Sequence, residues 1–201
     1  MSFVTRGFRR RNTMDAEPGR VPPGQYVTTD FPVLSAGPTP RVDRDEWRFT
    51  LTDATGEETT WNWEEFRALP HESITVDIHC VTKWSKLDTD WDGVSLDTLL
   101  ERVDGPRNHA LFSSYGGYTT NLPLADITGG KAWVVFGYGG EALRPEHGGP
   151  ARLLVPHLYF WKSAKWVKAV SLSEFDRRGF WESYGYHDYG DPWQEQRYQG
   201  D

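Results

Sequence analysis

Alternating apolar and polar residues predict that the chain forms several short β-strands. Trp47, Phe49 and Leu51 alternate with polar residues, which is the period of a strand with one buried face. The same alternation over residues 73–78 predicts another strand, and this strand ends next to Cys80. Further strands are predicted over residues 109–113, 131–138, 151–155 and 165–173. Because functional side chains often lie where a strand meets a loop, the end of the strand over 73–78 is a candidate site.

Helix start signals predict two short helices. Asn62 and Glu65 have the spacing of a capping box, and Pro70 stops the helix that they begin. Ser95 is placed to cap a second helix, and a polar, tryptophan-containing loop is predicted before it. The apolar positions of this second helix are Leu96, Leu99, Leu100 and Val103. Short helices among many short strands, without a regular alternation, predict a mixed α+β fold.

Length and proline content predict one domain behind a tail. The 201 residues, 37% of them hydrophobic, suffice for one substantial core, which we assign to residues 21–201. Residues 1–20 are predicted to be a disordered tail. Six of the thirteen prolines lie between Glu17 and Pro40, which predicts an extended arm lying over the domain.

Charge and cysteine content exclude several classes of function. The chain carries 22 basic and 29 acidic residues, a formal net charge of −7, which argues against nucleic acid or an anionic membrane as the main partner. No apolar run is long enough for a transmembrane segment. The basic first residues are not followed by the apolar core of an export signal, so a cytoplasmic location is expected. A single cysteine forms no internal disulfide or Cys-x-x-Cys pair, so redox chemistry requires a bound cofactor.

The only cysteine, Cys80, lies beside His79, Lys83 and Lys86. Nearby positive charge stabilises a thiolate, the form that attacks electrophiles and binds metals. One alternative is a buried cysteine that acts as a small hydrophobic residue. A Cys/His hydrolase is another, although no local signature of a known cysteine protease is present.

A second group of candidate residues lies between His147 and Ser173, where the chain contains no Asp or Glu. Its glycines at 148 and 149 let backbone amides approach an anion, and arginine and lysine side chains bind phosphate. The pattern indicates a phosphate-bearing ligand. A solvated basic strand edge is the alternative. The basic residues of this segment are Arg152, Lys162, Lys165 and Lys168.

Three motifs together resemble the molybdopterin-binding domain of the sulfite oxidase superfamily. They are His-Cys-Val-Thr-Lys-Trp-Ser at 79–85, His-Gly-Gly-Pro-Ala-Arg at 147–152 and Lys-Ser-Ala-Lys-Trp-Val at 162–167. The pattern is similar to the sulfite-oxidase-like proteins related to the catalytic subunit of periplasmic methionine-sulfoxide reductase. This resemblance implies a molybdenum–molybdopterin cofactor and an oxidoreductase that transfers an oxygen atom in a two-electron reaction.

The resemblance also implies roles for individual residues. Cys80 would be the metal ligand. Lys83, Trp84 and Tyr115 are our candidates for lining the pocket above such a metal, and Lys83 either attracts a polar or anionic substrate or is a solvent-exposed loop lysine. The cofactor would contact the segment that contains Phe31 and Pro32, one of Ser113, Ser114 or Tyr115, and the residues His147, Arg152, Ser163, Ala164 and Lys165.

Departures from the family pattern limit what can be said of the substrate. Val81 to Ser85 replace the small-residue and arginine-rich segment that follows the cysteine of sulfite oxidases, so sulfite is not favoured. We expect a small oxygen-bearing substrate such as a sulfoxide, with electrons from a separate partner. The alternative function is a non-catalytic module whose aromatic-rich residues 180–198 bind a ligand or partner.

Overall fold

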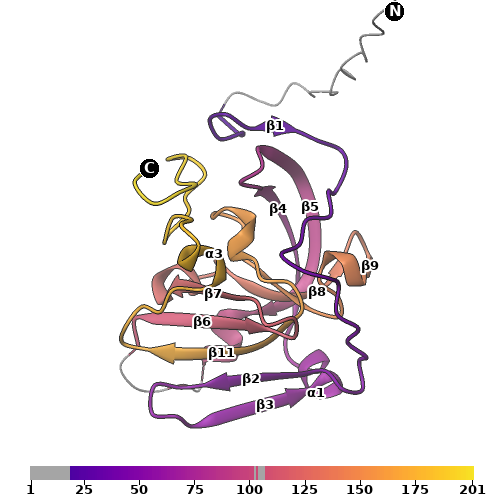
Figure 1. The fold of residues 1–201 in the computed structure, drawn as a ribbon. Coiled ribbons are helices and arrows are strands. Elements are labelled where there is room, and N and C mark those ends of the chain that lie inside the picture. Colours follow the sequence, from indigo (N-terminus) through magenta and orange to yellow (C-terminus); the bar gives the residue numbers. More distant parts are fainter. Residues whose placement is uncertain (1–18, 102, 104–106) are drawn as a thin grey trace, which may run out of the picture.

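The computed structural model describes residues 19–101, 103 and 107–201, and it contains two β-sheets with short helices (Figure 1). The predicted disordered tail lies almost wholly outside the described residues. The first sheet contains β1 (Tyr26–Val27), β4 (Glu72–His79), β5 (Trp84–Ser95), β8 (Trp133–Tyr138), β9 (Glu141–Ala142) and β10 (Arg152–Leu154). The second contains β2 (Arg48–Thr52), β3 (Glu58–Asn62), β6 (His109–Ser114), β7 (Thr119–Pro123) and β11 (Val167–Ser173). The predicted mixed α+β fold is confirmed.

The first sheet carries Arg152 on β10, and Cys80 directly follows its strand β4. Its order is β1-β5-β8-β10, with β4 also paired to β5 and β9 to β8, and the second sheet has the order β3-β2-β11-β6-β7. Side chains from both sheets meet in one large core, for example Phe49 of β2, Phe112 of β6 and Leu153 of β10. A smaller apolar cluster surrounds Cys80 and contains Trp91.

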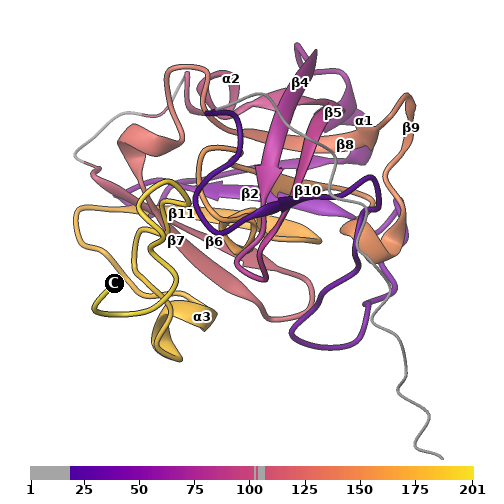
Figure 2. The same cartoon turned by 90° about the horizontal axis from the view of Figure 1, so that it is seen from above.

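The helices begin where the capping residues predict. Asn62 accepts a hydrogen bond from the Glu65 amide at 2.9 Å, and the Glu65 carboxylate accepts from the Asn62 amide at 2.8 Å. This capping box opens α1 (Trp63–Arg67), and Ser95 caps α2 (Leu96–Leu100). The C-terminal helix α3 (Phe180–Ser183) lies beside β7 (Figure 2). Three 3-10 turns complete the elements: η1 (Leu124–Asp126), η2 (Pro145–His147) and η3 (Phe160–Lys162).

The prediction of a polar loop before Ser95 is wrong, because these residues form the twelve-residue strand β5. Its aspartates and glycine disfavour a strand, but β4 and β8 pair with both of its edges and supply the ladder hydrogen bonds. Trp91 is buried in the core. Gly93 is required for close packing, since a Cβ there would lie 2.7 Å from the Val134 carbonyl oxygen.

The proline-containing arm lies against the first sheet. Its strand β1 pairs in parallel with the start of β5, and residues 28–46 that follow contain no helix or strand. The Phe31 ring stacks on the His147 imidazole, with centroids 4.0 Å apart and an angle of 11° between the planes. The arm therefore covers the segment that carries the predicted anion site. No helix within the described part of the chain is long and apolar enough to cross a membrane.

Candidate active and cofactor site

Cys80 occupies a tight turn between β4 and β5. The Lys83 amide donates to the Cys80 carbonyl at 2.9 Å, and the Cys80 amide donates to the Trp84 carbonyl at 2.8 Å. Lys83 closes this turn in the left-handed region, with φ of 75°. Only 7% of Cys80 is exposed, and its Sγ accepts a hydrogen bond from the Thr82 hydroxyl at 3.2 Å. The thiol is thus fixed in position by the backbone of the turn.

The positive charge near Cys80 does not come from the expected neighbours. Burial lowers the pKa of His79 to about 4, so its imidazole is neutral at pH 7. Lys83 is exposed, and Lys86 donates to the Thr29 carbonyl of the arm. Burial raises the pKa of the Cys80 thiol, and Arg152 is the cation that acts against this rise.

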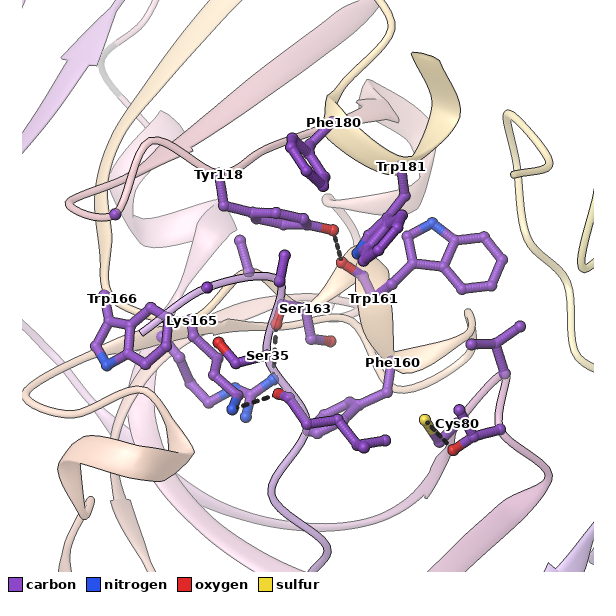
Figure 3. Close-up of a pocket in the computed structure, with 18 of the residues that line it drawn as sticks. Ser35, Cys80, Tyr118, Phe160, Trp161, Ser163, Lys165, Trp166, Phe180 and Trp181 are labelled. Carbon is purple, nitrogen blue, oxygen red and sulfur yellow. Dashed lines mark hydrogen bonds between the residues drawn. The ribbon is translucent and has the colours of Figure 1, made fainter. Parts of the chain in front are cut away.

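Cys80 lies on the wall of a cavity of about 490 Å³. In Figure 3, Cys80 lies at one end of this cavity and Lys165 and Trp166 at the other, with Phe160 and Ser163 between them. A cavity of this size lies within the range of small-molecule and cofactor sites.

Arg152, on β10, is buried beneath the cavity and is 1% exposed. Its guanidinium donates to the carbonyls of His147 at 2.8 Å and Ser163 at 2.6 Å, and it lies 4.1 Å from the Phe160 ring centroid. No carboxylate of the described residues forms an ion pair with it. Burial therefore lowers its pKa to about 9. A buried cation without a counter-ion favours the binding of an anion.

Lys165 adds a second cation beside Arg152. Its ammonium donates to the carbonyls of Leu34 and Glu146, both at 2.7 Å. Burial, followed by repulsion from Arg152, lowers its pKa to about 8. Gly148 makes this packing possible, because its φ is 108° and a Cβ there would lie 3.0 Å from the Cβ atoms of both Arg152 and Lys165.

These observations fit an anionic, metal-containing cofactor. The cavity joins a buried thiol to two cations that pair with no carboxylate in the described part of the chain. The His147 Nδ1 atom is also buried, with no hydrogen-bond partner among the described residues. Among the described residues, no group of three or more His, Cys, Asp or Glu side chains is arranged to hold a metal ion. The Cys80 thiol offers one protein ligand to a metal that such a cofactor would bring with it.

The structure brings most of the predicted site residues to this cavity. Those that line it are Phe31, Pro32, Cys80, Trp84, Arg152, Ser163, Ala164 and Lys165. His147 adjoins it, because its ring stacks on Phe31 and its carbonyl accepts from Arg152. Lys83, Ser113, Ser114 and Tyr115 are outside the lining. The Tyr115 hydroxyl instead accepts a hydrogen bond from the Arg48 amide at 2.6 Å, which holds it against β2.

Other lining residues were not assigned to the cofactor site from the sequence. They are aromatic side chains and a stretch of the arm: Tyr118, Phe160, Trp161, Trp166, Phe180, Trp181, Tyr186, residues 34–38 and Pro40. The sequence singled out the aromatic-rich segment 180–198, but only as the binding surface of the alternative, non-catalytic module, and it gave no signal for Tyr118, Phe160 or Trp161. Lys162, predicted as part of the basic segment, is fully buried and forms an ion pair with Glu182 at 2.7 Å, so its charge is not free for a ligand.

The fold and the cavity define a class of protein that binds an anionic cofactor through a cysteine thiol and a buried arginine. Residues 36–181 match the model of the oxidoreductase molybdopterin-binding domain. The chain therefore belongs to this family, and it is a molybdopterin-dependent oxidoreductase of the sulfite oxidase type. The predictions of the family, the fold class, the molybdenum–molybdopterin cofactor and an enzymatic function are confirmed.

Similar proteins extend this assignment. The chain is 42% identical over 186 residues to the uncharacterized oxidoreductase YuiH of Bacillus subtilis, covering 91% of this chain and 94% of that protein. It is 26% identical to the sulfite oxidase of Arabidopsis thaliana, covering 85% of this chain and 54% of that protein. It is 25% identical to the protein-methionine-sulfoxide reductase catalytic subunit MsrP of Campylobacter jejuni, covering 72% of this chain and 54% of that protein. The chain thus spans nearly all of YuiH and about half of the other two.

A solved structure supports the fold alone. The sulfane dehydrogenase SoxCD from Paracoccus pantotrophus superimposes with a TM-score of 0.61 at 19% identity, covering 68% of this chain and 40% of that chain.

Proposed function

We propose that the chain transfers an oxygen atom to or from a small oxygen-bearing substrate such as a sulfoxide, with Cys80 as the protein ligand to molybdenum. The observation that carries this proposal is that the Cys80 thiol shares one cavity with Arg152 and Lys165. This arrangement offers a metal ligand and an anion site in one enclosure. When bound, the cofactor supplies a two-electron redox couple and the site of oxygen transfer.

The residues around the cavity would bind and orient the cofactor. Arg152 and Lys165 would hold its phosphate, and Ser163 and Ala164 would form the adjoining wall. His147 and Phe31 would cover the pterin. Burial raises the pKa of Cys80, so the thiol keeps its proton in the apoprotein at neutral pH. A thiol must lose this proton to bind a metal, and the positive charge of Arg152 favours the loss.

Two observations support a sulfoxide as the substrate and reduction as the direction of transfer: the residues that follow Cys80 and the name of one relative. Val81 and Thr82 line the cavity next to the thiol, and neither carries a positive charge for an oxyanion such as sulfite. The name of MsrP assigns methionine-sulfoxide reduction to that protein. Reduction of a sulfoxide to a sulfide takes up two electrons and two protons and releases water. We propose that a separate partner donates these electrons, and we keep a cytoplasmic location as a prediction.

The proposal is tested with protein purified from a molybdenum-replete host. We expect that a reduced viologen dye supports sulfoxide reduction by the holoenzyme, and that Cys80→Ser abolishes turnover and changes the visible spectrum. The reason is that an alcohol is a much poorer metal ligand than a thiolate at neutral pH. Wild-type activity and an unchanged spectrum in Cys80→Ser would refute the role of Cys80. Sulfite oxidation without sulfoxide reduction would refute the choice of substrate.

A further inference from the structure

The cavity has a cationic side and an aromatic side. Arg152 and Lys165 are the only charged residues of its lining in the described chain, and both lie at the proposed cofactor site. The aromatic side consists of Tyr118 from the β6–β7 turn, Trp161 from η3, Phe180 and Trp181 from α3, and Tyr186 after α3. Figure 3 shows Tyr118, Phe180 and Trp181 grouped together, across the cavity from Cys80.

The aromatic rings form a continuous wall. The centroids of Tyr118 and Phe180 are 5.8 Å apart, those of Phe180 and Trp181 are 5.0 Å apart, and those of Trp181 and Tyr186 are 4.9 Å apart. All four residues are only partly buried. Half-buried aromatic side chains in a cavity retain apolar surface that a ligand can cover.

A buried ion pair holds this wall in place. The Trp161 indole N–H donates to the Glu182 carboxylate at 3.0 Å, and the Tyr118 hydroxyl donates to the Trp161 carbonyl at 2.7 Å. The same Glu182 oxygen lies 2.7 Å from the Lys162 ammonium, and both side chains are fully buried. The wall is thus positioned before any ligand binds, which reduces the entropy cost of binding.

We propose that the aromatic side is a subsite for the aryl or alkyl arm of a neutral oxygen-bearing substrate. This inference rests on the proposed function, because it places the substrate between the aromatic side and the metal. Once the cofactor occupies Arg152 and Lys165, the remaining lining offers no cation to a small oxyanion such as sulfite or nitrate. An anion against the negative faces of aromatic rings would lose its hydration without compensation.

The test measures equilibrium binding to the oxidised holoenzyme without reductant, so that no turnover occurs. Calorimetric titration compares methyl phenyl sulfone with dimethyl sulfone, two analogues that differ in one arm. We expect the phenyl compound to bind at least about tenfold more tightly, because its ring covers additional apolar surface. Trp181→Ala should remove this preference, and the conservative Trp181→Phe should keep most of it. Phe175→Ala is the control, since Phe175 is 76% exposed and outside the cavity lining, and it should behave as wild type.

Two results would overturn the inference: nitrate, which cannot reduce the oxidised enzyme, binding more tightly than methyl phenyl sulfone, or an unchanged phenyl preference in Trp181→Ala. The binding assay separates this inference from the proposed function. Phenyl preference without sulfoxide turnover would refute the proposed function and leave the subsite standing. Turnover of sulfoxides without phenyl preference would refute the subsite and leave the proposed function standing.

Discussion

Replacing Arg152 by methionine should affect the cofactor and the apoprotein differently. Methionine keeps a long, flexible side chain and removes the buried charge. We expect Arg152→Met to lose most of the cofactor while the stability of the apoprotein changes little. The two effects separate because, in the described structure, the Arg152 charge has carbonyl partners but no carboxylate partner.

The magnitudes follow from the surroundings of the guanidinium. Burial lowers the pKa of Arg152 to about 9, so the folded apoprotein gains no stability from keeping the guanidinium charged. Its short bonds to the carbonyls of His147 and Ser163 offset part of the burial cost, so loss of the charge should change the stability of the apoprotein little. Removing one partner of a buried ion pair would instead cost about 3–5 kcal/mol. With an anion bound, two charge-assisted bonds correspond to an affinity loss of about a hundredfold or more.

The assay needs two preparations of each variant. Protein from a cofactor-deficient host is unfolded with denaturant, and protein from a molybdenum-replete host is analysed for molybdenum and pterin. Lys168→Met is the control, because Lys168 belongs to the same basic segment but is exposed on β11. Full cofactor content in Arg152→Met would refute the anion site. A loss of about 4 kcal/mol or more in the apoprotein would show that the charge stabilises the fold through a partner of its own.

Two further predictions concern lysines. Lys83→Met should change KM by less than about twofold and leave the molybdenum content unchanged. The reason is that an exposed charge outside the cavity lining interacts weakly with a ligand inside it. A tenfold rise in KM would instead place Lys83 beside the substrate. The pKa of Lys165 is about 8 in the folded chain, below the ordinary lysine value, so above pH 8 the unfolded chain binds more protons than the folded one. The unfolding free energy of the apoprotein should therefore rise from about pH 8 to about pH 10. Denaturant titrations should show a smaller rise in Lys165→Met than in the wild type. An identical pH profile in the two proteins would contradict this prediction.

Local patterns predicted the elements whose signals are contained in a few residues. The alternation around Phe49 and the capping residue Asn62 depend on neighbours within one strand or one turn, and both were correct. Strand β5 was not predicted, because its aspartates tolerate an extended conformation only when β4 and β8 pair with it. The short strands β3 and β7 likewise depend on pairing with β2 and β6.

The cationic side of the cavity could be predicted from local sequence motifs, and the aromatic side could not. The cationic side follows from motifs in which Gly148, Arg152 and Lys165 lie close together in the sequence. The aromatic side depends on contacts between distant segments, such as the hydrogen bond from Tyr118 to Trp161. The sequence indicated residues 180–198 as an aromatic binding segment, but only the fold showed that Phe180, Trp181 and Tyr186 share a cavity with Cys80.

The ion pair between Lys162 and Glu182 also constrains the order of events during synthesis. Glu182 is translated twenty residues after Lys162, a delay of about 1–4 s at ordinary rates of elongation. During this interval the ammonium lacks the carboxylate that it meets in the folded protein, and the ring of Trp181 does not yet exist. The aromatic side of the cavity is thus assembled only when residues 180–186 are in place. The subsite proposed for the substrate arm therefore exists only in chains that have been synthesised through residue 186.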